Sequence, residues 1–158
     1  NPGITVYLPQ SLPQDVKDMV RSAGARFVEV STPVKVCTNV CSTGEMGAFI
    51  KEESLIITTL KGLVVVTGCA HPGVVRIVKQ AKTMFQSPVY MVLGGFHLSG
   101  VNPAHVSQVI KGLKEEGVIR VAPCHCSGDL ARGMFKEAYG KDCLLVGVGA
   151  QIIIDNAL

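Results

Sequence analysis

The stretch GLVVVTGCAHPG, residues 62–73, joins the most apolar run of the chain to a turn that carries a cysteine and a histidine. Leu63 to Thr67 has the length and the β-branched composition of a buried strand. The apolar spacing of the residues behind the turn predicts a helix over 73–83, so the stretch is typical of a β-α unit. Ligands gather beyond the carboxyl ends of strands in such sheets, and we therefore expect a site near His71.

The segments that follow continue the alternation of strand and helix. The pattern predicts strands over 89–93, 118–121, 144–148 and 151–154, and helices from Asn102 through Leu113 and over 128–139. We expect the strands of these β-α units to run parallel, with right-handed crossovers.

The segments before residue 62 favour antiparallel pairing. We predict strands over 4–8, 26–30, 34–40 and 54–60, a helix over 14–22 and a turn over 42–45. A hairpin through Lys61-Gly62 is expected to join the last of these strands to the strand at Leu63. The expected fold class is α/β, with a mixed sheet and β-α units.

Size and composition favour one domain over residues 1–158, at 16.7 kDa. With 47% hydrophobic residues, 17% charged residues and a mean hydropathy of +0.37, the chain is not disordered. The net charge of +3 is not clustered beside aromatic residues, so we expect no nucleic acid partner. No apolar stretch approaches the ~20 residues that cross a bilayer, and no signal peptide opens the chain, so we expect no membrane partner and a cytoplasmic location.

The six cysteines are interpreted as reduced thiols. Several end apolar strands or lie beside a histidine, and a domain of this size does not need disulfides to fold. A thiol redox role for Cys124 and Cys126 is disfavoured, because their spacing is Cys-x-Cys and not Cys-x-x-Cys.

Three of the four histidines, His71, His97 and His125, come directly after predicted strands and are flanked by small or turn-forming residues. One such histidine would be an ordinary loop residue, but three in successive units indicate a shared site at one edge of the sheet. Imidazole is the commonest metal ligand, so we predict that these three residues bind a divalent metal. Zinc is the preferred ion, and iron and manganese are the alternatives. The fourth, His105, lies in a predicted helix and is expected at its surface or half-buried.

Cysteines stand close to two of these histidines, since Cys124 and Cys126 flank His125 and Cys69 precedes His71 by two residues. Thiolates would favour a closed structural zinc site. In an extended turn, however, the two flanking cysteines would point away from the histidine between them. Cysteine ligation is therefore the less favoured interpretation, and Cys69 and Cys143 are expected to be small buried apolar side chains.

Four carboxylates are further candidates for the site. Glu45, in the turn STGEMG, is expected to be a solvated turn residue, the alternative being a residue that supports the site or the substrate. Glu52 and Glu53 are interpreted as an exposed charged stretch before a strand. Asp129 is expected in the first turn of a helix, where the helix dipole favours a carboxylate.

Three motifs in this order, residues 62–73, VYMVLGGFHLSG (89–100) and VIRVAPCHCSGD (118–129), resemble the second half of metallo-β-lactamase-fold proteins. The subgroup with the best resemblance contains dihydropterin-type aminobenzene-phosphate synthases and metal-dependent hydrolases. STGEMG and KEESLII resemble the middle segment of that subgroup, so the resemblance covers nearly the whole chain. It implies the C-terminal half of an αββα sandwich.

The resemblance also assigns metal ligands. His71 and His125 fall at the later metal-binding histidines of the superfamily, while His97 falls near the place where many members carry a bridging aspartate. The signature His-x-His-x-Asp-His does not occur, and no His-x-His is present anywhere. Because Asn1 is not an initiator methionine, we expect a partial domain that begins after that signature.

Two classes of function remain open. The resemblance implies part of a metal-dependent hydrolase or synthase that acts, when complete, on a small-molecule substrate of phosphate, ester or pterin type. The alternative is a non-catalytic binding or assembly module made from a truncated fold. An apolar face that the missing N-terminal half would have covered predicts a homo-oligomer, a dimer in the simplest case. Neither hypothesis assigns a catalytic residue.

Overall fold

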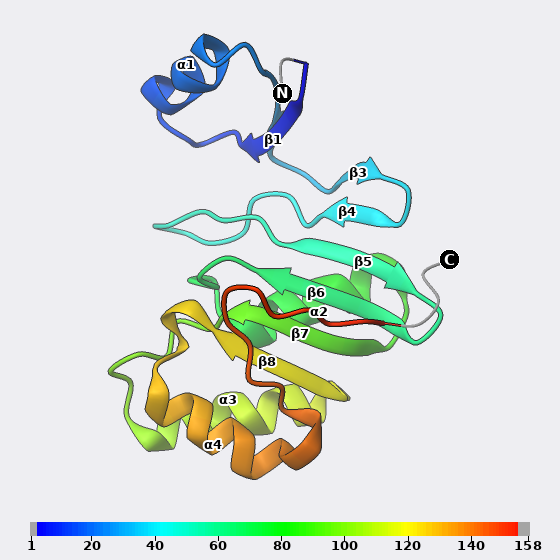
Figure 1. Ribbon diagram of the computed structural model, residues 1–158, viewed down its shortest axis with the longest axis vertical. Coiled ribbons are helices and arrows are strands. Elements are labelled where there is room, and N and C mark those ends of the chain that lie inside the picture. The colour runs from blue at the N-terminus through cyan, green and yellow to red at the C-terminus, as the bar shows by residue number, and fades with distance from the viewer. Residues whose placement is uncertain (1–2, 155–158) are drawn as a thin grey trace.

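The structure, a computed structural model, describes residues 3–154 (Figure 1). Its strands are β1 (Thr5–Pro9), β2 (Arg26–Val30), β3 (Val34–Cys37), β4 (Val40–Ser42), β5 (Leu55–Thr59), β6 (Gly62–Thr67), β7 (Val89–Gly95) and β8 (Arg120–Cys124). Its helices are α1 (Gln14–Ser22), α2 (Val74–Phe85), α3 (Pro103–Glu115) and α4 (Asp129–Tyr139), with short 3-10 turns at His125–Ser127 and Gly140–Asp142. The order of these elements is that of a mixed α/β protein.

Strand β6 lies between the antiparallel and the parallel parts of a six-stranded sheet with the order β3-β4-β5-β6-β7-β8. It pairs antiparallel with β5 through a tight hairpin in which Thr59 faces Gly62. On its other side it runs parallel to β7, which runs parallel to β8. Leu63, Val64 and Val65 are at most 2% exposed, as expected of a strand that is covered on both faces. The predicted fold class is confirmed.

Helices α2, α3 and α4 pack together against the parallel half of the sheet. Each carries an apolar stripe at helical spacing, and in α2 the buried residues of this stripe are Val74, Ile77, Val78 and Ala81. The stripes meet Leu63, Val65, Val92 and Val121 of the sheet in one apolar core. Phe96 and Phe135 meet edge to face inside it, with ring centroids 5.4 Å apart.

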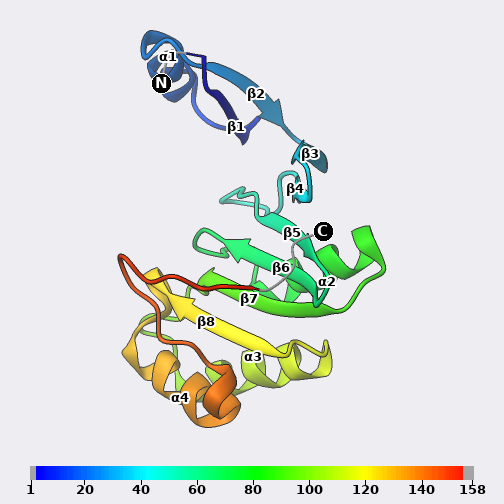
Figure 2. The ribbon, with the colours of Figure 1, turned by 45° about the vertical axis from the view of Figure 1, so that its right-hand side comes forward.

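The residues after α4 cross the face of the sheet opposite α2 (Figure 1 and Figure 2). Strand alternation points Val64, Met91 and Ala122 toward this face, and all three are at most 2% exposed. A cavity of about 460 Å³ lies here. It is lined by Leu93, Cys124 and His125 on the sheet side and by Val146, Gly147, Val148, Ala150 and Ile152 of the crossing segment.

A small β-α-β unit, made of β1, α1 and β2, lies beyond the β3 edge of the sheet (Figure 2). Its two strands run parallel and not antiparallel as expected before residue 62, because α1 connects them. The Tyr7 hydroxyl donates to the Val36 carbonyl at 3.5 Å, and the Ser11 N–H donates to the Glu45 carboxylate at 2.5 Å. Polar contacts of this kind tie the unit to the rest of the chain.

Several predicted strands differ from the structure. The strand expected over 34–40 is two strands, β3 and β4, because Asn39 takes a left-handed φ of 62° and reverses the chain. The strand expected over 118–121 begins two residues later and ends at Cys124.

No strand forms over 144–148 or 151–154. Cys143 makes one β-bridge to Val121, and the Leu144 N–H donates to the Val121 carbonyl at 2.8 Å. The apolar residues that follow pack across the face of the sheet and do not extend its edge. Among the described residues, no helix is both long and apolar enough to span a bilayer.

Candidate metal centre at the carboxyl ends of β6, β7 and β8

The loops that follow β6, β7 and β8 are joined by backbone hydrogen bonds. The Gly95 N–H, at the end of β7, donates to the carbonyl of Gly68 at 2.9 Å. The carbonyl of Cys126, after β8, accepts the N–H groups of Leu98 at 3.2 Å and Ser99 at 3.1 Å. The three loops therefore form one connected edge, on which side chains from distant parts of the sequence meet.

Gly95 allows two of these loops to touch. A Cβ at this position would lie 2.4 Å from the carbonyl oxygen of Gly68 and 2.7 Å from Cys126 Sγ. It would also lie 3.1 Å from the Cα of Cys69. Only a residue without a side chain fits between the two cysteines.

The backbone is strained at each of the three loops. Ala70, His97 and His125 have φ values of 60°, 51° and 50°, in the left-handed region that costs about 1 kcal/mol or more for a residue with a Cβ. Hydrogen bonds stabilise these loop conformations. In one of them, the buried Ser127 hydroxyl accepts the Phe96 N–H at 3.2 Å. Strain of this kind collects at functional sites.

His71 is oriented by Glu52, which precedes β5. One carboxylate oxygen of Glu52 contacts His71 Nδ1, and the other accepts the His71 backbone N–H at 3.1 Å. Two backbone hydrogen bonds with Met46, of 2.8 and 2.9 Å, hold Glu52 in turn. Because Nδ1 is engaged, Nε2 is the nitrogen of His71 that remains for an ion, and a carboxylate behind the imidazole is the usual arrangement at metal-binding histidines.

His97 lies against His71. The two ring centroids are 4.3 Å apart, with an interplanar angle of 58°. His97 is exposed and His71 is half-buried, so the pair lies at the surface end of the site.

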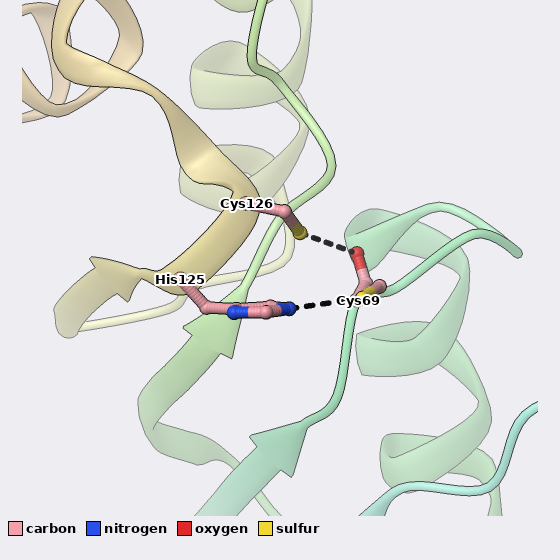
Figure 3. A group of neighbouring side chains, drawn as sticks. All are labelled: Cys69, His125 and Cys126. Atoms are coloured by element: carbon pink, nitrogen blue, oxygen red, sulfur yellow. Dashed lines mark hydrogen bonds between the residues drawn. The ribbon is translucent and has the colours of Figure 1, made fainter.

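His125 points toward Cys69, and Cys126 stands beside them (Figure 3). The distance from His125 Nε2 to Cys69 Sγ is 3.3 Å, and the Cys126 thiol donates to the Cys69 carbonyl at 3.6 Å. Burial raises the pKa of the Cys69 thiol, and Cys126 and Glu52 raise it further through hydrogen bonding and negative charge.

Two groups of donor atoms within 4.8 Å of one another occur among the described residues. One consists of Glu52, Cys69 and His71, and the other of Cys69, His125 and Cys126. Imidazole nitrogen, thiolate sulfur and carboxylate oxygen are the ligands that zinc takes in proteins. The donor set therefore fits a divalent cation, with Cys69 common to both groups.

The three predicted histidines lie on the same edge of the sheet, but they do not form one triad of touching rings. His71 and His97 pack together, whereas His125 pairs with Cys69. His105, the histidine expected on a helix surface, lies exposed on α3.

The interpretation of the cysteines needs correction. The turn after β8 is not extended but a 3-10 turn, so Cys126 comes back to the same side as His125 and reaches Cys69. Cys69 is only partly buried, and Cys143 alone is the buried small side chain that was expected, at 1% exposed. The Ser-Gly pair behind Cys126 was the sequence signal for a tight turn. All six cysteines are free.

Three of the carboxylates also differ from expectation. Glu53 is half-buried and accepts a hydrogen bond from the Ser42 hydroxyl. Glu52 is not part of an exposed stretch, because its side chain is 17% exposed and contacts His71. No pattern in the sequence links Glu52 and His71, which are 19 positions apart.

The side chain of Glu45 is 8% exposed and pairs with Lys51 at 3.1 Å, so it is not a solvated turn residue. Hydrogen bonding from Ser11 lowers the pKa of Glu45, and Lys51 adds to this effect. Asp129 lies in the first turn of α4, as predicted.

Two cavities adjoin the site on the side of α2. One of about 340 Å³ is lined by His71, Pro72, Arg76 and residues 47–50. A second, of about 400 Å³, shares Gly47 and Arg76 with the first and also has Lys79 in its wall. Arg76 therefore brings positive charge to the cavity that His71 lines, whereas the second cavity has Glu45 as well as Arg76 and Lys79 in its wall.

Comparison with known proteins gives two curated relatives, both from Methanocaldococcus jannaschii. The first, a 7,8-dihydropterin-6-methyl-4-(beta-D-ribofuranosyl)-aminobenzene-5'-phosphate synthase, is 30% identical over 85% of this chain and 55% of its own length. The second, an uncharacterized protein, is 34% identical over 54% of this chain and 34% of its own length. This chain thus spans about half of the first relative and a third of the second. No family model matches the sequence.

Comparison with solved structures gives a crystal structure of a metal-dependent hydrolase of the beta-lactamase superfamily. It superposes with a TM-score of 0.85 at 24% sequence identity, over 98% of this chain and 72% of that chain. Likeness at this level of identity is evidence for the fold. Together with the first curated relative, it confirms the resemblance stated from the three sequence motifs.

Proposed function

Because this chain has the fold of the metallo-β-lactamase superfamily, we propose that it carries part of the metal centre of a hydrolase or synthase that acts on a phosphate, an ester or a pterin-type substrate. His71, His97 and His125 are the proposed ligands of a divalent metal, with zinc first and iron or manganese as alternatives. The signature His-x-His-x-Asp-His is not in the sequence, so these residues supply some of the ligands of the centre and not all.

The observation that carries the proposal is the pair of Glu52 and His71. A carboxylate engages Nδ1 and the backbone N–H of the same histidine, which leaves one defined nitrogen, Nε2, for an ion. His97 packs on this ring and His125 lies on the neighbouring loop. A histidine that served only to fill a loop would not need both contacts from one carboxylate.

A divalent ion bound here would lower the pKa of a coordinated water to about 7 and polarise a phosphoryl or carbonyl oxygen of the substrate. The residues of the chain have positioning roles. Glu52 fixes the tautomer and the ring orientation of His71, and the hydrogen-bonded loops keep the three histidines at one edge before substrate arrives.

Arg76 supports a phosphate substrate. It lines the cavity that His71 also lines, and a guanidinium can bind two phosphate oxygens at once. The name of the first curated relative includes a 5'-phosphate group, which is consistent with an anionic group in this position.

Metal content tests the proposal directly. The purified chain, stripped and then supplied with Zn²⁺, Mn²⁺ or Fe²⁺, is analysed for its metal-to-protein ratio. We expect a ratio near one or above, and a loss of affinity of more than about tenfold in His71→Ala and in His125→Ala. His105→Ala, a change of an exposed histidine on α3, is the matched control and should keep the wild-type ratio.

Hydrolysis of a chromogenic phosphate monoester and of a carboxylic ester by the loaded chain is the second measurement. The substrate class follows from which of the two is turned over, and Arg76→Ala should weaken the phosphate ester selectively. Wild-type metal content in both His71→Ala and His125→Ala would refute the metal centre. A chain that binds no metal would support the non-catalytic binding or assembly module in its place.

A further inference from the structure

The two thiols beside His125 are not accounted for by a centre made of histidines. Cys69 and Cys126 come from different loops, after β6 and after β8, and Gly95 is the residue that lets them approach. Both are partly exposed, in contrast to Cys143, which is buried among apolar side chains. A solute can therefore reach the two thiols.

The distances suit a single soft cation. In a tetrahedral site with Zn–S of about 2.3 Å and Zn–N of about 2.0 Å, a sulfur and a nitrogen ligand lie ~3.5 Å apart. The observed distance between Cys69 Sγ and His125 Nε2 is 3.3 Å, and Cys126 Sγ lies within 4.8 Å of both.

We infer that Cys69, Cys126 and His125 form a thiolate-imidazole site for a thiophilic divalent cation such as Zn²⁺, with a fourth position open to solvent. Binding releases one proton from each thiol, and no change of oxidation state is involved. Two thiolates and one imidazole leave a fourth position for water or a substrate group, the arrangement of a catalytic and not of a closed structural zinc site.

Cys69 places this site next to the other group of donors. Its sulfur also lies within 4.8 Å of donor atoms of Glu52 and His71. A thiolate in this position lies within reach of both groups of donor atoms, so Cys69 can link them.

The inference goes beyond the proposed function, because it concerns sulfur ligation and does not require that the chain turn over any substrate. It shares His125 with the proposed histidine centre. The test below has a spectroscopic readout that only thiolate ligands produce, so its failure is separable from a failure of the hydrolase proposal.

The test is an anaerobic titration of the reduced, metal-free chain with Co²⁺, followed by absorption. Thiolate ligands give a sulfur-to-cobalt charge-transfer band in the near ultraviolet, which histidine and carboxylate ligands do not. We expect the band to saturate at one Co²⁺ per chain and to be displaced by Zn²⁺. Cys69→Ser and Cys126→Ser should each reduce the band to about half and weaken binding by more than about tenfold.

Cys37→Ser is the control, since Cys37 is an exposed thiol on β3 with no role in the cluster. His71→Ala should leave the charge-transfer band in place, which separates this site from the histidine centre. A band that survives in the Cys69→Ser, Cys126→Ser double variant would refute the inference, as would the absence of any band in the wild-type chain.

Thiol protection gives a reading that does not depend on how the variants fold. In the wild-type chain, Zn²⁺ should shield Cys69 and Cys126 from alkylation while Cys37 stays reactive, as measured by mass spectrometry of the peptides. Equal alkylation of all three with and without Zn²⁺ would overturn the assignment.

Discussion

Gly95 has no side chain, and the space this leaves sets the distance between the loops that carry Cys69 and Cys126. Glu52 is a second single residue with a large effect, because its carboxylate contacts both Nδ1 and the backbone N–H of His71 and so orients the ring. Gly95 shapes the site through its lack of a side chain, and Glu52 shapes it through its contacts with His71. Their roles can be tested by single substitutions.

Gly95→Ala should lower the free energy of unfolding by about 1–3 kcal/mol, because the added methyl group meets a carbonyl oxygen at 2.4 Å and a sulfur at 2.7 Å. Chemical denaturation measures this change. Gly133→Ala is the control, since a Cβ on that residue of α4 meets no atom within 4 Å and alanine favours the helix. Equal stability of the two variants would contradict the packing argument.

Glu52→Gln should weaken metal binding by about 10- to 100-fold, because an amide holds the His71 ring less firmly and does not raise its basicity. Isothermal titration with Zn²⁺ measures the affinity. Glu137→Gln, an exposed change on α4, should bind as the wild type does. If the two variants bound equally well, the role of Glu52 would be wrong.

At the scale of elements, the helices that cover the sheet are joined by charged side chains as well as by the core. Lys82, in the last turn of α2, contacts Glu116 just after α3, with Nζ to Oε2 at 2.8 Å and Nζ to the backbone carbonyl at 2.9 Å. The hydrogen bond from Lys82 lowers the pKa of Glu116 below its usual value near 4.5.

The sign of the resulting pH dependence follows from linkage. A carboxylate with a depressed pKa in the folded state adds stability above its unfolded pKa, and this stability is lost as the pH falls through the folded pKa. We therefore expect Glu116→Gln to reduce the drop in melting temperature on acidification below about 4.5. Glu115→Gln, whose carboxylate is 64% exposed, should leave the profile unchanged. Identical profiles for Glu116→Gln and the wild type would show that the pair contributes no pH dependence.

At the scale of the whole molecule, and within residues 3–154, the sheet has helices on one face and the segment 144–154 on the other (Figure 1). Large apolar side chains are exposed in this segment and near the site, including Phe49, Ile50, Val148 and Ile153. Burial of such side chains is favourable at about 25 cal/mol per Å². A second copy of the chain is the expected cover.

Light scattering should therefore give the mass of a dimer for the purified chain, and Val148→Asp should shift it toward the monomer, because a carboxylate cannot be buried there without cost. Val148 is fully exposed in the single chain, so the substitution should not change its folding. A monomeric mass at every concentration would rule out self-association through this face.

The sequence alone determined the alternation of strands and helices, the mixed sheet and the edge at which the histidines lie. These depend on local periodicity and on short connections, which are readable along the chain. Only the tertiary structure decided which donors meet: Glu52 with His71, and Cys69 with Cys126 and His125. It also decided that residues 144–154 cross the sheet instead of joining it. Such contacts depend on left-handed turns and on close approaches between loops far apart in sequence, and no periodicity encodes them.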